Sequence, residues 1–182
     1  MRNVKGSIML PWVKTIKANK TGAYNQYLTE KDRETISKLI LPSSWYDFET
    51  YKNCFNAVVA VEAKGAVEVC RDWGRAYSDV IMSSVYKRAI KKGDPRAAMD
   101  QFTFVFKSMF NFGKVVSEFV SDREMIVTIE EFDPHVEAWY YVTRGWLERF
   151  IELCLDKKVT SEFVSKSWRG DPVTAIKAAW SV

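Results

Sequence analysis

The chain has 182 residues, of which 47% are hydrophobic and 27% are charged, and its net charge is +4. This balance is typical of one folded domain and excludes a collagen-like or a disordered chain. At this length a hydrophobic core can hold the fold without a disulfide or a structural metal. A charge of +4 without a concentrated basic patch also argues against a nucleic-acid partner.

Nothing in the sequence indicates secretion or a membrane span. The apolar stretch at residues 7–13 is followed at once by lysines, so it is too short for a secretory signal. No uncharged stretch approaches the ~18 residues that a span needs. The cysteines, Cys54, Cys70 and Cys154, are widely spaced and form no CxxC pair, so we expect buried thiols in a cytoplasmic protein.

The first 65 residues have the apolar spacing of helices. One helix is predicted between Ser7 and Gly22, a second over Thr29 to Leu41, and a third that begins after Asp47 as its N-cap. The side chains expected to face inward are Ile36, Leu39 and Ile40 in the second helix and Phe48, Tyr51, Phe55 and Val58 in the third.

Two longer helices are predicted next. The first covers residues 66–92 and stops at the sequence Gly93-Asp94-Pro95. The second runs from Pro95 to Asp122 and is apolar over more than half of its girth, so we expect it to be the central element of the fold. The alternation of phenylalanines at 102, 104 and 106 would also fit a strand, but the longer helical pattern outweighs it.

After Asp122 the pattern changes to the alternation of strands. We expect strands over Arg123–Glu131, Lys158–Trp168 and Thr174–Trp180. Between the first and the second lies a helical pattern at residues 135–157. The turn at residues 169–172 joins the last two strands as a hairpin.

This order of elements predicts an α+β fold. N-terminal helices are followed by β-α-β-β, with a small, mostly antiparallel sheet packed on long helices. No linker, internal repeat or low-complexity stretch is visible in the sequence. We therefore expect residues 1–182 to form a single domain.

Few residues have the pattern of a catalytic or metal site. His135 is the only histidine, and no cysteine or carboxylate lies three or four residues after it. A Ser/His/Asp triad would have this one possible base, and no glycine-rich phosphate-binding motif occurs. We expect no enzyme activity, no catalytic residue, no metal and no cofactor.

One cluster of basic residues lies where two predicted helices meet. Cations at the C-terminus of a helix complement its dipole, and few aromatic residues that could stack on bases are interleaved with these. We therefore expect a solvated helix end and no nucleic-acid partner. The cluster consists of Lys87, Arg88, Lys91, Lys92 and Arg96.

The aromatic content is the most unusual feature of the composition. The chain has 7 Trp, 8 Tyr and 11 Phe, together 14% of its residues. Such side chains line pockets for apolar ligands, but they are also enriched in cores and in oligomer interfaces. The side chains predicted to line a ligand pocket are Trp73, Tyr77, Phe102, Phe106, Phe110 and Trp146.

Several short motifs occur along the chain: Lys5-Gly6-Ser7, Leu41-Pro42-Ser43-Ser44-Trp45-Tyr46, Gly93-Asp94-Pro95, Arg144-Gly145-Trp146-Leu147-Glu148, and Trp168-Arg169-Gly170-Asp171-Pro172 leading to Ala179-Trp180. With the order of elements, they resemble the V4R (4-vinyl reductase-like) and haem-NO-binding-like superfamily. Subunits of a eukaryotic vesicle-tethering complex share this fold. The resemblance covers most of the chain.

The resemblance implies a fold that holds a small molecule. Members of the superfamily bind aromatic effectors, haem or an acyl chain. The aromatic sensors have zinc-binding cysteines, and Cys154 is at most the one counterpart of these in this chain. The proximal histidine and the Tyr-x-Ser-x-Arg motif of the haem branch are missing. We expect a cytosolic small-molecule-binding or sensory domain with an apolar, aromatic-lined pocket. The alternative is a homodimeric protein-interaction subunit without a ligand.

Overall fold

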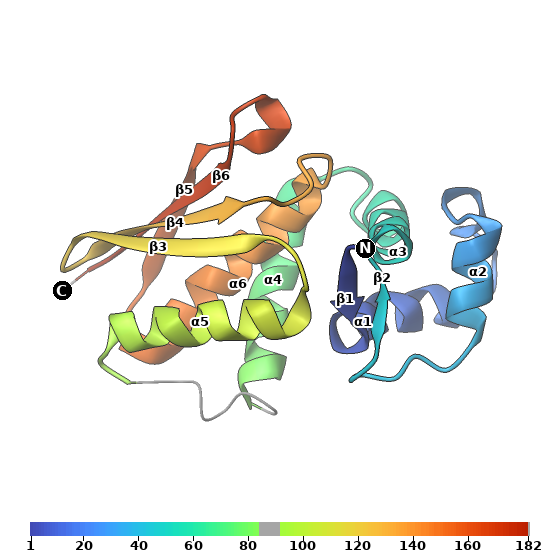
Figure 1. Ribbon diagram of the computed structural model, residues 1–182, viewed down its shortest axis with the longest axis horizontal. Helices are drawn as coiled ribbons and strands as arrows, with labels where there is room; N and C mark the ends of the chain where they lie inside the picture. The colour runs from blue at the N-terminus through green and yellow to red at the C-terminus, as the bar shows by residue number, and fades with distance from the viewer. Residues whose placement is uncertain (84–91, 182) are drawn as a thin grey trace. The chain divides into compact units, whose positions relative to one another are not determined.

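A computed structural model describes residues 1–83 and 92–181 of the chain. It contains helices and antiparallel strands, which confirms the predicted α+β class (Figure 1). The chain divides into two compact units: unit 1 comprises residues 1–67 and 107–112, and unit 2 comprises residues 68–106 and 113–182. No helix within the described residues has both the length and the low charge needed to cross a bilayer.

Unit 1 is mostly helical. Its two short strands pair antiparallel, with Val4 opposite Tyr46, and the sequence analysis did not predict either of them. Each strand has three residues, which is too short for an alternating pattern to be recognised. The elements are β1 (Asn3–Lys5), α1 (Gly6–Ala18), η1 (Asn25–Tyr27), α2 (Glu30–Ser37), β2 (Trp45–Asp47) and α3 (Phe48–Glu62).

Helix α3 begins as predicted. The Asp47 carboxylate accepts a hydrogen bond from the Glu49 N–H at 3.3 Å, so Asp47 is the N-cap. The predicted inner face is confirmed, because the side chains that form it are buried. They are Phe48, Tyr51, Phe55 and Val58.

Helix α2 ends earlier than predicted, so the expected burial of Leu39 is wrong. A capping box at Thr29 and Asp32 starts the helix, which ends at Ser37. The Lys38 backbone is already extended, with φ −75° and ψ 169°, and the chain turns away toward β2. Leu39 is therefore 79% exposed, whereas Ile36 and Ile40 are buried as expected.

Unit 2 contains a four-stranded antiparallel sheet and the long helices. The strand order is β3-β4-β6-β5. Figure 1 shows β3 and β4 as a long hairpin with α5 beneath it. The elements are α4 (Val67–Ser83), α5 (Pro95–Met109), β3 (Lys114–Ser121), β4 (Glu124–Glu130), α6 (Glu137–Leu155), β5 (Val159–Ser165), η3 (Ser167–Arg169) and β6 (Thr174–Trp180).

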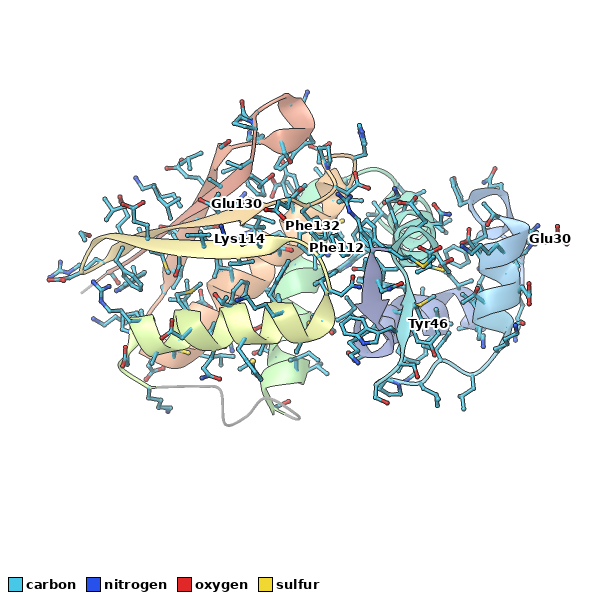
Figure 2. The ribbon with its side chains drawn as sticks, in the orientation of Figure 1. Glu30, Tyr46, Phe112, Lys114, Glu130 and Phe132 are labelled. Carbon is cyan, nitrogen blue, oxygen red and sulfur yellow. The ribbon has the colours of Figure 1, made fainter. Side chains whose placement is uncertain are left out.

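The three predicted strands are observed as β4, β5 and β6 of one sheet, although β5 ends at Ser165, three residues before its predicted end, and η3 follows it. Val127 of β4 pairs with Ile176 of β6, and both are buried. The predicted hairpin between β5 and β6 is also present. At the end of the sheet next to Gly113, Lys114 of β3 and Glu130 of β4 form an ion pair of 2.9 Å (Figure 2).

The predicted helix from Pro95 to Asp122 is wrong from residue 110 onward, which is nearly half of its length. Helix α5 ends at Met109, and β3 follows it. Gly113, with φ +75°, supplies a left-handed turn that a helix cannot continue through. Beyond it Val115 pairs with Ile129 of β4, so the β-branched residues take part in the sheet.

The prediction that the Phe-rich helix is the central element is also wrong. Phe104 of α5 is 63% exposed, so this helix is not packed all round. Helix α6 takes the central position in unit 2, because its side chains contact α4, α5 and β5. The helix predicted over residues 66–92 is observed as α4 up to Ser83. Its residues 84–91, with Lys87, Arg88 and Lys91 of the basic cluster, lie outside the described residues.

Candidate functional site

Helices α4 and α6 of unit 2 cross with their backbones in contact at two glycines. A Cβ atom on Gly74 would lie 1.9 Å from the Val142 carbonyl oxygen, and one on Gly145 would lie 1.9 Å from the Arg71 carbonyl oxygen. No larger residue fits at either position without moving a helix. The crossing therefore fixes the side chains of the two helices relative to each other.

An aromatic cluster lies beside this crossing. The Trp146 ring of α6 lies 4.8 Å from the Phe102 ring of α5 and 6.4 Å from the Tyr77 ring of α4, measured between ring centroids. Phe102 also lies 5.9 Å from Phe150 of α6. Phe102 and Trp146 are buried, and Tyr77 is partly buried. Three helices thus each contribute rings to one apolar wall.

Two buried polar atoms of the helices α4 and α6 have no hydrogen-bond partner in the part of the chain that the structure describes. They are the Trp146 Nε1 and the Ser78 Oγ. Ser78 is 0% exposed and Trp146 is 6% exposed, so bulk water does not reach them freely. A buried tryptophan N–H normally donates to an acceptor, and a hydroxyl both donates and accepts. A molecule with an acceptor atom, seated against the rings, would satisfy the Trp146 N–H.

The structure brings together half of the residues that the sequence predicted for a pocket. Tyr77, Phe102 and Trp146 lie in the aromatic cluster. Trp73 lies one turn before Tyr77 on α4 and is also partly buried.

The other two predicted pocket residues lie in different surroundings. Phe106 is buried against Phe132 and Trp139, at centroid distances of 6.2 and 6.3 Å. Phe110 belongs to unit 1, where its ring lies 6.4 Å from the Tyr51 ring. The aromatic stripes of one sequence therefore serve more than one cluster.

Sequence reasoning did not single out Ser78. The signal was present in the spacing of small residues on α4, because Cys70, Gly74 and Ser78 recur every four residues and all three are buried. Such a stripe marks the face on which another helix approaches closely. It does not show that the serine hydroxyl would lack a partner.

A buried network of charges holds the other side of the crossing. Glu148 of α6 has a side chain that is 0% exposed, and it accepts hydrogen bonds from the Arg71 Nε at 2.9 Å and the Arg75 Nη1 at 3.2 Å. The Ser161 hydroxyl of β5 also donates to Glu148, and the Arg144 Nε donates to the Ser161 Oγ at 2.7 Å. The network joins α4, α6 and β5, so it positions the helices that carry the aromatic cluster.

A second carboxylate extends this network toward the surface. Burial would raise the pKa of Glu152, but hydrogen bonds from Arg75 and Arg149 outweigh it and hold the pKa below its usual range. The Arg75 Nη2 lies 2.8 Å from the Glu152 carboxylate. Glu152 therefore carries its negative charge at neutral pH.

Two surface hollows are lined by described residues of unit 2, and neither lining includes a predicted pocket residue. One, of about 270 Å³, lies over strands β5 and β6. The other, of about 360 Å³, lies at the C-terminal end of α6 beside Arg75 and Arg149. The second is lined by four cations, but two of them already pair with Glu152.

The three cysteines are free and buried, as expected from their spacing. Burial raises the pKa of the Cys54 thiol to about 12 and that of the Cys70 thiol to about 11. Both thiols are therefore protonated at neutral pH and behave as apolar core groups.

No protein-family model matches the chain, and no curated protein matches it. Solved structures do. An Fe(II) unliganded H-NOX protein from K. algicida matches with a TM-score of 0.70 at 10% identity, covering 98% of this chain and 97% of that one. An H-NOX protein from S. oneidensis in the Fe(II)NO state matches with a TM-score of 0.68 at 9% identity, covering 97% and 99%. A T. tengcongensis H-NOX mutant matches with a TM-score of 0.64 at 14% identity, covering 98% of each chain. The predicted haem-NO-binding fold is therefore confirmed.

The residues of this chain do not fit a haem held through an imidazole. The similar structures include H-NOX proteins with Fe(II), and one of them was determined to probe haem distortion in the H-NOX family. Here the single histidine, His135, is exposed in the turn before α6. Within residues 1–83 and 92–181, no three His, Cys, Asp or Glu side chains are grouped to hold a metal ion.

Proposed function

We propose that this protein is a sensory domain that binds an apolar or aromatic small molecule against the rings of Tyr77, Phe102 and Trp146 in unit 2. One observation carries the proposal: the Trp146 indole N–H is buried and has no acceptor among the described residues. An unsatisfied buried donor costs about 1–3 kcal/mol. A ligand with an acceptor atom would recover that cost on binding.

The chemistry of the two buried polar atoms defines the class of ligand. The Trp146 N–H donates only, so the ligand must present an oxygen or nitrogen acceptor to it. The Ser78 hydroxyl, on the same face of α4 as Gly74, can both donate and accept a hydrogen bond. The rings around Trp146 favour a flat apolar body. A phenol or another small oxygen-bearing aromatic compound has both features.

The shared fold supports this proposal. The similar structures include H-NOX proteins crystallised with NO and with oxygen, so in those proteins the fold accommodates a small ligand. The narrower relationship to V4R proteins, and Trp73 as a further pocket residue, remain part of the proposal, whereas Phe106 and Phe110 do not, because they lie in other aromatic clusters. We propose no catalytic step at this cluster.

A homodimeric interaction subunit without a ligand is the second candidate. The observation that favours it is β3, an edge strand of the sheet, which exposes Val116 by 39% and Val120 by 54%. For either function we propose a cytoplasmic location, which the three unpaired thiols support.

Native mass spectrometry of freshly purified protein distinguishes the two functions, because it reports subunit number and retained ligand together. A thermal-shift screen with phenols, fatty acids and tetrapyrroles then identifies the ligand class. We expect a phenol to raise the melting temperature, since a hundredfold excess over Kd adds about 2.7 kcal/mol to the stability of the folded state.

The variant Trp146→Phe removes the N–H and keeps an aromatic ring. We expect it to weaken phenol binding about tenfold or more, as loss of a buried hydrogen bond does. The matched control is Trp180→Phe. Trp180 of β6 is also buried, at 8% exposed, but it is not one of the residues of the aromatic cluster. A protein that purifies without ligand and is not stabilised by any of the three compound classes would contradict the proposal.

A further inference from the structure

The loop between α2 and β2 in unit 1, together with Trp45 at the start of β2, exposes large apolar side chains. Leu39 is 79% exposed, Leu41 is 48% exposed and Trp45 is 45% exposed. The three lie within seven consecutive residues, with Pro42 and Ser43 also exposed between them. We refer to residues 38–45 as the 38–45 loop. A cluster of exposed apolar side chains of this kind marks an interaction surface.

The 38–45 loop is held in place by backbone hydrogen bonds to the start of α1. The Gly6 N–H donates to the Ser44 carbonyl at 2.9 Å, and the Ser7 N–H donates to the Pro42 carbonyl at 3.0 Å. The Leu41 N–H donates to the hydroxyl of Tyr46, which is labelled in Figure 2, at 2.8 Å. The leucines are therefore presented on a fixed backbone, so binding would cost little conformational entropy for ordering the loop.

Lysines bracket the 38–45 loop at both ends. The Lys5 Nζ lies 2.7 Å from the Ser43 carbonyl oxygen and 4.1 Å from the centre of the Trp45 ring. At the other end the Lys17 Nζ donates to the Lys38 carbonyl at 3.2 Å. Lys38 itself pairs with Glu34 at 2.8 Å, but both side chains are more than two-thirds exposed, so this pair is weak.

The positive charge of the whole chain lies in the same part of the sequence. Residues 1–67 contain ten Lys and Arg against six Asp and Glu, which equals the net charge of +4 of the full chain. Residues 68–182 contain seventeen of each. An anionic surface would therefore attract the segment that carries the exposed leucines.

We propose that the 38–45 loop docks the protein on the surface of an anionic lipid bilayer. Leucine and tryptophan side chains insert at the boundary between headgroups and acyl chains, while lysines meet the lipid phosphates. A protein partner fits less well, since lysine is depleted in protein interfaces and here Lys5 lies over the exposed Trp45 ring. The inference is independent of the proposed ligand site, which lies in unit 2.

Co-sedimentation of the full chain with vesicles tests the proposal. We expect binding to vesicles of mixed phosphatidylserine and phosphatidylcholine, and much weaker binding to phosphatidylcholine alone. The double variant Leu39→Ser/Leu41→Ser should lower the partition constant at least about tenfold, because it removes the inserted apolar groups. Lys17→Gln should lower it about fivefold, and added salt should weaken binding of the parent.

Two variants outside the loop serve as controls. Phe104→Ser replaces an apolar side chain of α5 that is 63% exposed, and Lys157→Gln removes an exposed cation after α6. Both should bind vesicles like the parent, and thermal unfolding should show that all variants are folded. The proposal fails if the parent does not bind phosphatidylserine vesicles, if it binds neutral vesicles equally well, or if the leucine variant binds like the parent.

Discussion

The carboxylate of Glu148 shows how much one residue can hold in place. Its side chain has no exposed surface, and Arg71 and Arg75 compensate its charge from α4. Removing a charge from water costs several kcal/mol, which is regained only when every partner is in place. The network therefore fixes the geometry of the α4–α6 crossing, and it contributes to stability only as a complete set.

The variant Glu148→Gln should lower the free energy of unfolding by about 3–5 kcal/mol, because it leaves the partly buried Arg71 without its counterion and removes one of the two carboxylates that pair with Arg75. Urea titration measures this loss. The control Glu130→Gln breaks the exposed pair with Lys114, whose side chains are 34% and 56% exposed, and should cost less than about 1 kcal/mol. Equal small losses in the two variants would show that the network is not structural.

The candidate site could be predicted from the sequence only in part. Tyr77, Phe102 and Trp146 were found because each lies on an apolar stripe, and stripes face other elements. Helical spacing cannot say which stripes meet, so Phe110 was grouped with residues of unit 2. An unsatisfied hydrogen bond depends on every neighbouring atom, so the state of the Trp146 N–H was not predictable either.

At the scale of the elements, strand signals near the C-terminus were reliable because alternation, β-branched residues and flanking turns agreed. The β4 and β6 predictions fall within a residue of the observed ends. After Met109 the spacing of the apolar residues fits both a helix and a strand. The helix was predicted because the helical pattern of the preceding residues continued into this segment. Residues 114–121 form a strand because they pair with β4, and the apolar spacing within this one segment does not reveal that pairing.

The glycine crossing of α4 and α6 gives a prediction at this scale. Alanine is better than glycine in a helix interior by about 1 kcal/mol, so Gly145→Ala would stabilise α6 if there were space. We expect instead a loss of at least about 2 kcal/mol, because the Cβ would lie 1.9 Å from the Arg71 carbonyl oxygen.

Chemical denaturation measures the sign of this effect. The control Asp72→Ala changes an exposed position of α4 and should stay within about 0.5 kcal/mol of the parent. A gain in stability for Gly145→Ala would mean that the two helices are not in backbone contact.

For the whole molecule, both units contain a carboxylate whose charged form is favoured by folding. A hydrogen bond from Lys31 holds the pKa of Asp47 in unit 1 below its usual range. In unit 2 burial opposes the charge of Glu152, yet Arg75 and Arg149 still lower the pKa. A carboxyl whose pKa is lower in the folded chain stabilises the fold above its unfolded pKa, and loses that contribution as the pH falls through the folded value.

We therefore expect the free energy of unfolding to fall as the pH is lowered from about 6 to about 3. For Glu152 the loss begins near its ordinary pKa of 4.5 and continues below it.

Glu152→Gln removes the charge at every pH, so it should be less stable than the parent at neutral pH and approach the parent at acidic pH. The control Asp100→Asn, at an exposed position of α5, should follow the parent throughout. Urea titrations at a series of pH values measure the two curves. A constant difference between Glu152→Gln and the parent would show that the arginines do not stabilise the charged form, because only a charge-dependent contribution disappears on protonation.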